Sequence, residues 1–209
     1  MPPAATMIEP GSETASEKWE NEFRERDYKL AELIQRIANG DQSAIAKFYQ
    51  MTNRLIFGLV LRILGNRDSA EEVLFDVYTQ VWRQAARYEA KRGGPTSWLI
   101  TIARSRAIDR LRADKHYVLH DELTEAAANE YLTTENPETA TAISELQGFV
   151  RSALETLSPD QREVIEMAYY AGMTQSEIAL QLGIAIGTVK TRTRLAMAKL
   201  RDALQPLMV

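Results

Sequence analysis

Four residues near the C-terminal end of the sequence are of the polar or basic types that contact DNA in proteins: Lys190, Thr191, Arg194 and Arg201. At about 100° per residue they fall on one face of a helix. Lys and Arg donate hydrogen bonds to guanine acceptors and phosphates, and Thr contacts either group. The opposite face carries residues suited to packing: Val189, Thr193, Ala196, Leu200, Ala203 and Leu204. The pattern therefore favours recognition of a nucleic acid by the exposed side of a helix.

Capping signatures and glycines position this helix within a motif. Residues 158–161 (Ser-Pro-Asp-Gln) supply an N-cap, a proline at the first helical position and a Gln that closes a capping box. Residues 174–177 (Thr-Gln-Ser-Glu) repeat the signature after Gly172. Gly183 can end the short second helix in the left-handed conformation, and a third helix starts near Gly187. This order predicts a helix-turn-helix motif, whose second helix enters the DNA major groove.

The composition excludes several other functions. The 209 residues contain no Cys, so a disulfide, a thiolate nucleophile and a cysteine zinc site are ruled out. The sequence has no Gly-rich phosphate loop, nucleophile elbow or carboxylate pair on a defined helix face, so we predict neither an enzyme nor a cofactor or small-molecule substrate. The longest nearly apolar run, Leu55 to Leu61, is too short to span a bilayer. We expect a cytoplasmic protein with no membrane insertion of its own.

Charge is distributed unevenly along the chain, although the formal net charge is −4. Residues 91–112 contain six Lys or Arg and one Asp. Residues 1–28 contain seven acids and three bases, and residues 114–145 contain eight acids and one Lys. Positive charge is therefore concentrated in residues 91–112 and in the third helix of the motif, which predicts two separate nucleic-acid contacts.

Hydrophobic spacing predicts an all-α fold, because no stretch alternates as a strand does. We expect helices after Leu30, after the cap Asp41, after the capping pair Asp68 and Glu71, and from Thr96 to about Arg112. The predicted organisation is two small helical domains joined by a flexible acidic linker, with these boundaries: a disordered acidic tail over 1–28, a first domain over 29–113, the linker over 114–140, and the helix-turn-helix domain over 141–209.

Two histidines four residues apart, His116 and His120, raise the alternative of a metal site. Three acids lie beside them: Asp114, Asp121 and Glu122. With no Cys and no third imidazole, a solvated linker explains these residues better, and we predict no metal.

Two groups of residues, in this order and spacing, resemble the extracytoplasmic-function (ECF) group of bacterial sigma factors, small specificity subunits of RNA polymerase. The N-terminal group resembles sigma region two and comprises residues 60–65, 70–73, 81–83, 98–104 and 107–112. The C-terminal group resembles sigma region four and comprises residues 157–159, 177–179 and 187–192. The resemblance covers roughly residues 30–112 and 143–204.

This resemblance implies three contact surfaces and three partners: core RNA polymerase, promoter DNA and an anti-sigma factor, which in the family is often membrane-anchored. Polymerase binding is implied for Glu71, Glu72, Phe75, Asp76, Tyr78 and Trp82. Recognition and melting of the −10 element are implied for Trp98, Arg104, Ser105, Arg106, Asp109, Arg110 and Arg112. Recognition of the −35 element is implied for Thr188, Lys190, Thr191, Arg192 and Arg194. From the residues alone, Trp98 fits a core position as well as a role in strand opening.

The chain departs from the family pattern at four positions. Phe75 stands where the family often has Gln, and Ser105 where it often has Asn in the base-capturing region. Leu195 and Met197 stand where Arg is frequent, which implies fewer phosphate contacts on the −35 side unless Arg194 compensates.

An alternative of another class is a two-domain helix-turn-helix repressor or activator. Such a protein binds duplex DNA alone and as a dimer, whereas a sigma factor binds promoters only with polymerase. A polymerase pull-down distinguishes the two.

Overall fold

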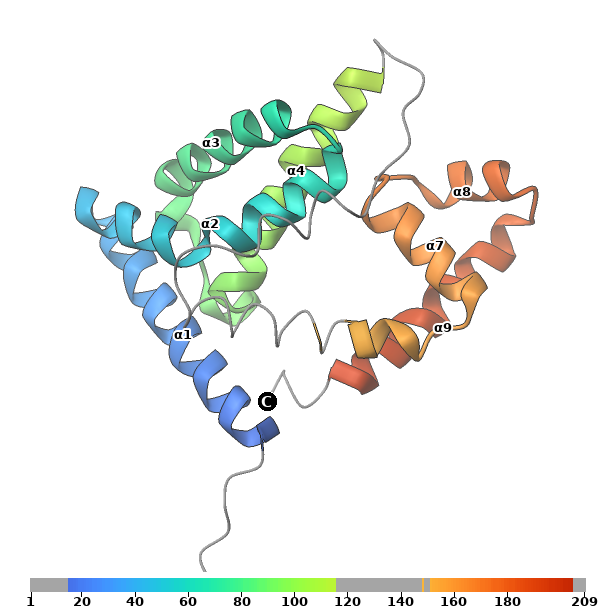
Figure 1. Ribbon diagram of the computed structural model, residues 1–209, viewed down its shortest axis with the longest axis horizontal. Coiled ribbons are helices and arrows are strands. Elements are labelled where there is room, and N and C mark those ends of the chain that lie inside the picture. Colours follow the sequence, from blue (N-terminus) through green and yellow to red (C-terminus); the bar gives the residue numbers. More distant parts are fainter. Residues whose placement is uncertain (1–14, 116–147, 149–150, 205–209) are drawn as a thin grey trace, which may run out of the picture.

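Helices are the only regular secondary structure in the part of the chain that the computed structural model describes, residues 15–115, 148 and 151–204 (Figure 1). The N-terminal domain contains α1 (Ala15–Ala38), α2 (Gln42–Leu64), α3 (Arg67–Gln84), the 3₁₀ turns η1 (Ala85–Arg87) and η2 (Ala90–Arg92), and α4 (Pro95–Lys115). The C-terminal domain begins with helical residues 151–155 and contains α7 (Pro159–Tyr169), α8 (Gln175–Leu182) and α9 (Ile186–Leu204). The all-α, two-domain prediction is confirmed.

The N-terminal domain has a continuous core to which α1, α2, α3 and α4 all contribute. Leu30 and Phe48, from α1 and α2, are fully buried, as are Val77 and Leu99 from α3 and α4. Burying these side chains provides most of the stabilisation of the four-helix unit. The C-terminal core is far smaller and is built around three fully buried residues, Val164, Ile178 and Val189, one from each helix.

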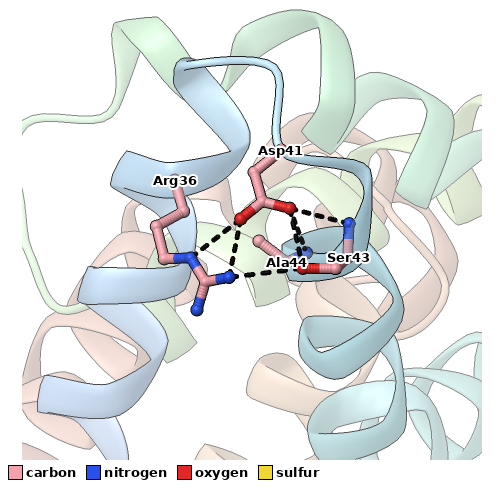
Figure 2. Close-up of polar contacts among 4 residues, drawn as sticks. All are labelled: Arg36, Asp41, Ser43 and Ala44. Carbon is pink, nitrogen blue, oxygen red and sulfur yellow. Dashed lines mark hydrogen bonds and ion pairs between the residues drawn. The ribbon is translucent and has the colours of Figure 1, made fainter.

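The turn between α1 and α2 follows the predicted capping chemistry (Figure 2). One carboxylate oxygen of Asp41 accepts hydrogen bonds from the backbone N–H groups of Ser43 and Ala44 at 2.8 and 3.3 Å. The other accepts from Nε and Nη2 of Arg36 at 3.0 and 2.6 Å. The hydroxyl of Ser43 and the Arg36 guanidinium lower the pKa of Asp41 to about 2, so it stays ionised at the start of the helix.

Two sequence predictions about this domain are wrong. Helix α1 already begins at Ala15, so residues 15–28 are helical and not part of a disordered tail. Contacts with other helices hold its middle in place: Arg26 donates to the carbonyl of Met51 at 2.6 Å, and Asp27 accepts from the Thr96 hydroxyl at 2.5 Å. Tertiary contacts of this kind compensate for a weak local hydrophobic pattern.

The start of α3 also differs from the prediction. Asn66 is the N-cap and accepts from the backbone N–H of Ser69 at 2.9 Å, in place of the expected pair of Asp68 and Glu71. Helix α3 ends at Gln84, and η1 and η2 follow before Gly93. The chain turns after α3, and Tyr88 packs against Trp98 with ring centroids 5.4 Å apart.

Candidate nucleic-acid interface

The helix-turn-helix motif forms as its capping residues predict. Thr174 accepts from the backbone N–H of Glu177 at 3.3 Å, and the Glu177 carboxylate accepts from the N–H of Thr174 at 2.6 Å. Ser158 and Gln161 make the same reciprocal pair at the start of α7. Gly183 ends α8 with φ +65°, the left-handed conformation that glycine adopts without steric cost. These local devices fix the angle at which α9 leaves the turn.

Helix α9 divides into the two faces expected from its sequence, except that Ala203, expected on the packing face, is exposed. Val189 and Ala196 are fully buried against α7 and α8. The predicted −35 residues Thr188, Lys190, Thr191 and Arg194 are exposed. Leu195 and Met197 are exposed as well, so the two positions that depart from the family pattern add apolar surface to this helix.

Arg192 differs from the other basic residues predicted on α9. Its guanidinium forms an ion pair with Asp160 in the first turn of α7, and only 25% of its side chain is exposed. An arginine held by a carboxylate has fewer donors left for a phosphate. Arg192 therefore ties α9 to α7; the helical spacing already leaves it off the face of Lys190 and Arg194, and only the resemblance grouped it with them.

The predicted −10 residues of α4 lie in four different surroundings. Ser105 and Asp109 are exposed. Arg106 donates to the side chain of Gln80 at 2.5 Å, and Arg110 pairs with Glu72 at 2.8 Å and with Asp114 at 3.0 Å. These contacts fix both guanidinium groups along the α3–α4 side of the domain.

Arg104 and Arg112 of α4 contact the C-terminal domain. They donate to its backbone carbonyls at Ala168, Tyr169 and Gly172. Trp98 packs against the N-terminal core and remains only partly exposed, which supports a core position for at least part of its ring.

The predicted polymerase-binding residues lie on α3, and all but one present exposed side chains. Phe75 is 74% exposed and Trp82 is 38% exposed, and Glu71, Glu72 and Asp76 are exposed beside them. Phe75 and Trp82 are seven residues apart, about two turns, and so lie on the same face of α3; exposed apolar side chains that gather on one face favour a protein-binding surface.

Tyr78 is the exception, and the structure removes it from the predicted polymerase-binding residues. It is only 8% exposed, and its hydroxyl lies 2.7 Å from Oγ1 of Thr52, which itself donates to the carbonyl of Phe48. Burial raises the pKa of Tyr78 far above its usual value. Tyr78 therefore belongs to the α2–α3 core, because a buried hydroxyl has found its partner on α2.

A groove of about 440 Å³ runs between α2 and α3 beside Phe75. Its lining residues are Tyr49, Asn53, Arg54, Phe57, Arg67, Glu71, Leu74 and Phe75. The aromatic residues on the α2 side, Tyr49 and Phe57, are absent from the set predicted from sequence. Their spacing on α2 resembles that of core residues, so nothing in the sequence marks them as surface.

The described residues form neither a metal-binding cluster nor a membrane-spanning helix. Within residues 15–115 and 151–204, no three His, Cys, Asp or Glu side chains gather where they could hold a metal ion. No helix in the described part of the chain is long and apolar enough to span a membrane. His116, His120 and nearly all of the acidic stretch lie outside the described residues.

Comparisons with known proteins agree with this geometry. The chain matches the family models of Sigma-70 region 2 over residues 48–117 and Sigma-70, region 4 over residues 150–200. It is 36% identical over 179 residues to the ECF RNA polymerase sigma factor SigK of Mycobacterium ulcerans, covering 86% of this chain and 95% of that one. SigK of Mycobacterium tuberculosis strain H37Rv is 34% identical, with 84% and 93% covered.

Among solved structures, Rhodobacter sphaeroides SigE in complex with the anti-sigma ChrR is 25% identical, with a TM-score of 0.44 and coverage of 82% of this chain and 98% of that chain. Two region models matched in order, together with full-length relatives, exclude a stand-alone repressor. The chain belongs to the ECF RNA polymerase sigma factors, a family of transcription initiation factors.

Proposed function

We propose that this chain binds core RNA polymerase through α3, reads the −35 element through α9 and contacts the −10 element through α4. The observation that supports this proposal best is the separation of surfaces. Exposed Phe75 and Trp82 lie on α3, whereas exposed Lys190 and Arg194 lie on another domain. Protein-binding and DNA-binding surfaces can then be occupied at the same time.

Helix α9 is the element assigned to duplex DNA. Its exposed Lys190 and Arg194 can reach guanine acceptors or phosphates, and Thr188 and Thr191 can supply shorter contacts. Helix α4 is assigned to opened DNA, where cationic groups beside aromatic side chains hold a single strand. Arg106 and Ser105 are exposed there, and Trp98 is partly so.

The apolar groove beside Phe75 is assigned to the polymerase. Its aromatic residues Tyr49, Phe57 and Phe75 can bury area against a partner helix, while Arg67 and Glu71 supply polar contacts at its edge. An anti-sigma protein that covers this groove would keep the chain from polymerase. We place both events in the cytoplasm and assign the chain a binding function without catalysis.

The test is a pull-down with purified core polymerase, followed by transcription from a template that the resulting complex selects. Phe75→Ala should reduce polymerase capture, whereas Lys190→Ala should leave capture intact and reduce transcription. Loss of both activities in both variants would contradict the division between α3 and α9. Capture of polymerase by neither the wild-type chain nor the variants would contradict the proposal as a whole.

A further inference from the structure

The corner between α7 and α8, residues 168–173, lies against the N-terminal domain (Figure 1). Nε of Arg104 donates to the carbonyl of Tyr169 at 3.0 Å, and its Nη2 donates to that of Ala168 at 2.7 Å. Arg112, two turns further along α4, donates to the carbonyl of Gly172 at 2.8 Å. The last carbonyls of a helix lack partners within it and form the negative end of its dipole. Arg104 therefore caps the C-terminus of α7, and Arg112 binds the turn that follows this helix.

Aromatic side chains complete the same contact. The guanidinium of Arg62 lies 4.2 Å from the ring centroid of Tyr170, and that of Arg104 lies 4.9 Å from the centroid of Tyr169. Tyr170 also packs against the core of the N-terminal domain. Burial raises the pKa of both tyrosines, so their hydroxyls stay protonated at neutral pH.

Gly172 lies close against Ile108 on α4 of the N-terminal domain. It has φ +62°, and a Cβ added there would lie 2.6 and 2.7 Å from two side-chain carbons of Ile108 on α4. No side chain fits at that distance unless the side chain of Ile108, which is buried, or the domain itself shifts. Gly183 in the same domain has φ +65° and nothing within 4 Å of the corresponding position. It therefore offers a control with the same backbone strain and no contact across the domains.

We infer that the free protein closes on itself through this interdomain contact, formed by Arg62, Arg104, Ile108 and Arg112 on one side and residues 168–173 on the other. Closure occupies Arg104 and Arg112, two arginines that the resemblance implies for the −10 element, and the inference rests on the proposed assignment of α4 to that element. A guanidinium bonded to helix-terminal carbonyls must release them before it binds a phosphate. Closed protein and DNA-bound α4 are therefore mutually exclusive states.

The energetic consequence is a reduced affinity of the free protein for opened DNA. When only a fraction of molecules is open, the apparent dissociation constant rises by the inverse of that fraction. When two sites are coupled, occupation of one typically changes the affinity of the other by about 5-fold or more. Variants on the C-terminal side of the contact open the protein and leave Arg104 and Arg112 free to bind DNA.

The first measurement reports the distance between the domains in the full-length chain. Since the sequence has no Cys, cysteines introduced at exposed Ala86 and Gln181 can carry a pair of fluorescent dyes. Gly172→Ala and Tyr170→Ala should lower energy transfer, whereas Gly183→Ala should match the wild type. Circular dichroism verifies that each variant keeps its helices. Unchanged transfer in both Gly172→Ala and Tyr170→Ala would overturn the inference.

The second measurement titrates a fluorescent single-stranded DNA with the same proteins. Gly172→Ala and Tyr170→Ala should bind about 5-fold tighter than the wild type or more, and Tyr28→Ala, an exposed tyrosine of α1, should not. Lower energy transfer without tighter binding would show that closure does not limit DNA access. Adding Arg104→Ala to Gly172→Ala should remove the gain. If the tighter DNA binding persists in the double variant, the role proposed for α4 is wrong. The energy-transfer measurement still shows independently whether the free protein is closed.

Discussion

Lys190 and Arg194 are exposed basic residues of α9 on the face assigned to DNA. Replacing either by Ala should weaken binding of the polymerase complex to its −35 element by about 1–3 kcal/mol, the usual cost of a lost base contact. Filter binding of the assembled complex to promoter DNA measures the change. Lys47→Ala, an exposed charge on α2, is the matched control. Wild-type affinity in both α9 variants would show that this face does not read DNA.

Phe75 is the most exposed aromatic residue of α3 and borders the groove between α2 and α3. Its truncation to Ala should weaken binding to core polymerase by more than about 1 kcal/mol, as expected for a central apolar anchor. Biolayer interferometry with immobilised polymerase measures the affinity. Tyr28→Ala serves as control because it removes an equally exposed ring from α1. Equal losses in the two variants would rule out a specific role for Phe75.

Helices α2 and α3 are joined inside the core by the hydroxyls of Thr52 and Tyr78. Because Thr52 donates to Phe48, Tyr78 donates to Thr52, and Tyr78→Phe should cost about 0.5–1.5 kcal/mol of the free energy of unfolding. Tyr49→Phe should cost almost nothing, because Tyr49 is exposed. Urea denaturation followed by circular dichroism compares the two. A larger loss in Tyr49→Phe would contradict the hydrogen-bond assignment.

Asp27 connects α1 to the start of α4, and burial, opposed by the hydrogen bond from Thr96, raises its pKa. A carboxyl with a raised pKa in the folded state contributes stability below its unfolded pKa and loses it as pH rises through the folded value. Asp27→Asn should therefore gain stability relative to the wild type as the pH is raised from acid to neutral. Melting temperatures across that range test this expectation. A difference that stays constant with pH would show that Asp27 does not titrate within it.

The sequence predicted correctly those helix ends at which the capping residue and the backbone groups that it bonds lie within a few residues of each other. Asp41, Ser158, Thr174 and Gly183 act as expected, since a cap needs only its own turn. The helix over residues 15–28 and the burial of Tyr78 depend on partners far along the chain. The same is true of Arg104 and Arg112, whose carbonyl partners lie at least 60 residues away. Residue type and spacing contain no information about such pairings.

At the scale of the whole molecule, we expect the acidic segments to compete with DNA for the basic segments. Residues 1–14 carry two acids and residues 114–145 carry eight, against the basic segments of α4 and α9. Neutralising the acids between 121 and 138 should tighten DNA binding by the free chain at low salt, because phosphate contacts dominate that affinity. The gain should shrink as salt rises, since charges are screened beyond about 8 Å at physiological ionic strength. A gain independent of salt would exclude electrostatic competition.

The central claim is that this chain gives core polymerase its promoter specificity. Run-off transcription with purified core polymerase, with and without the protein, on a library of genomic fragments tests it most directly. We predict transcripts that start at discrete sites only when both components are present, and that disappear with the Lys190→Ala, Arg194→Ala double variant. Tight binding of the free chain to the same fragments at physiological salt, with no transcript in the presence of polymerase, would contradict the claim.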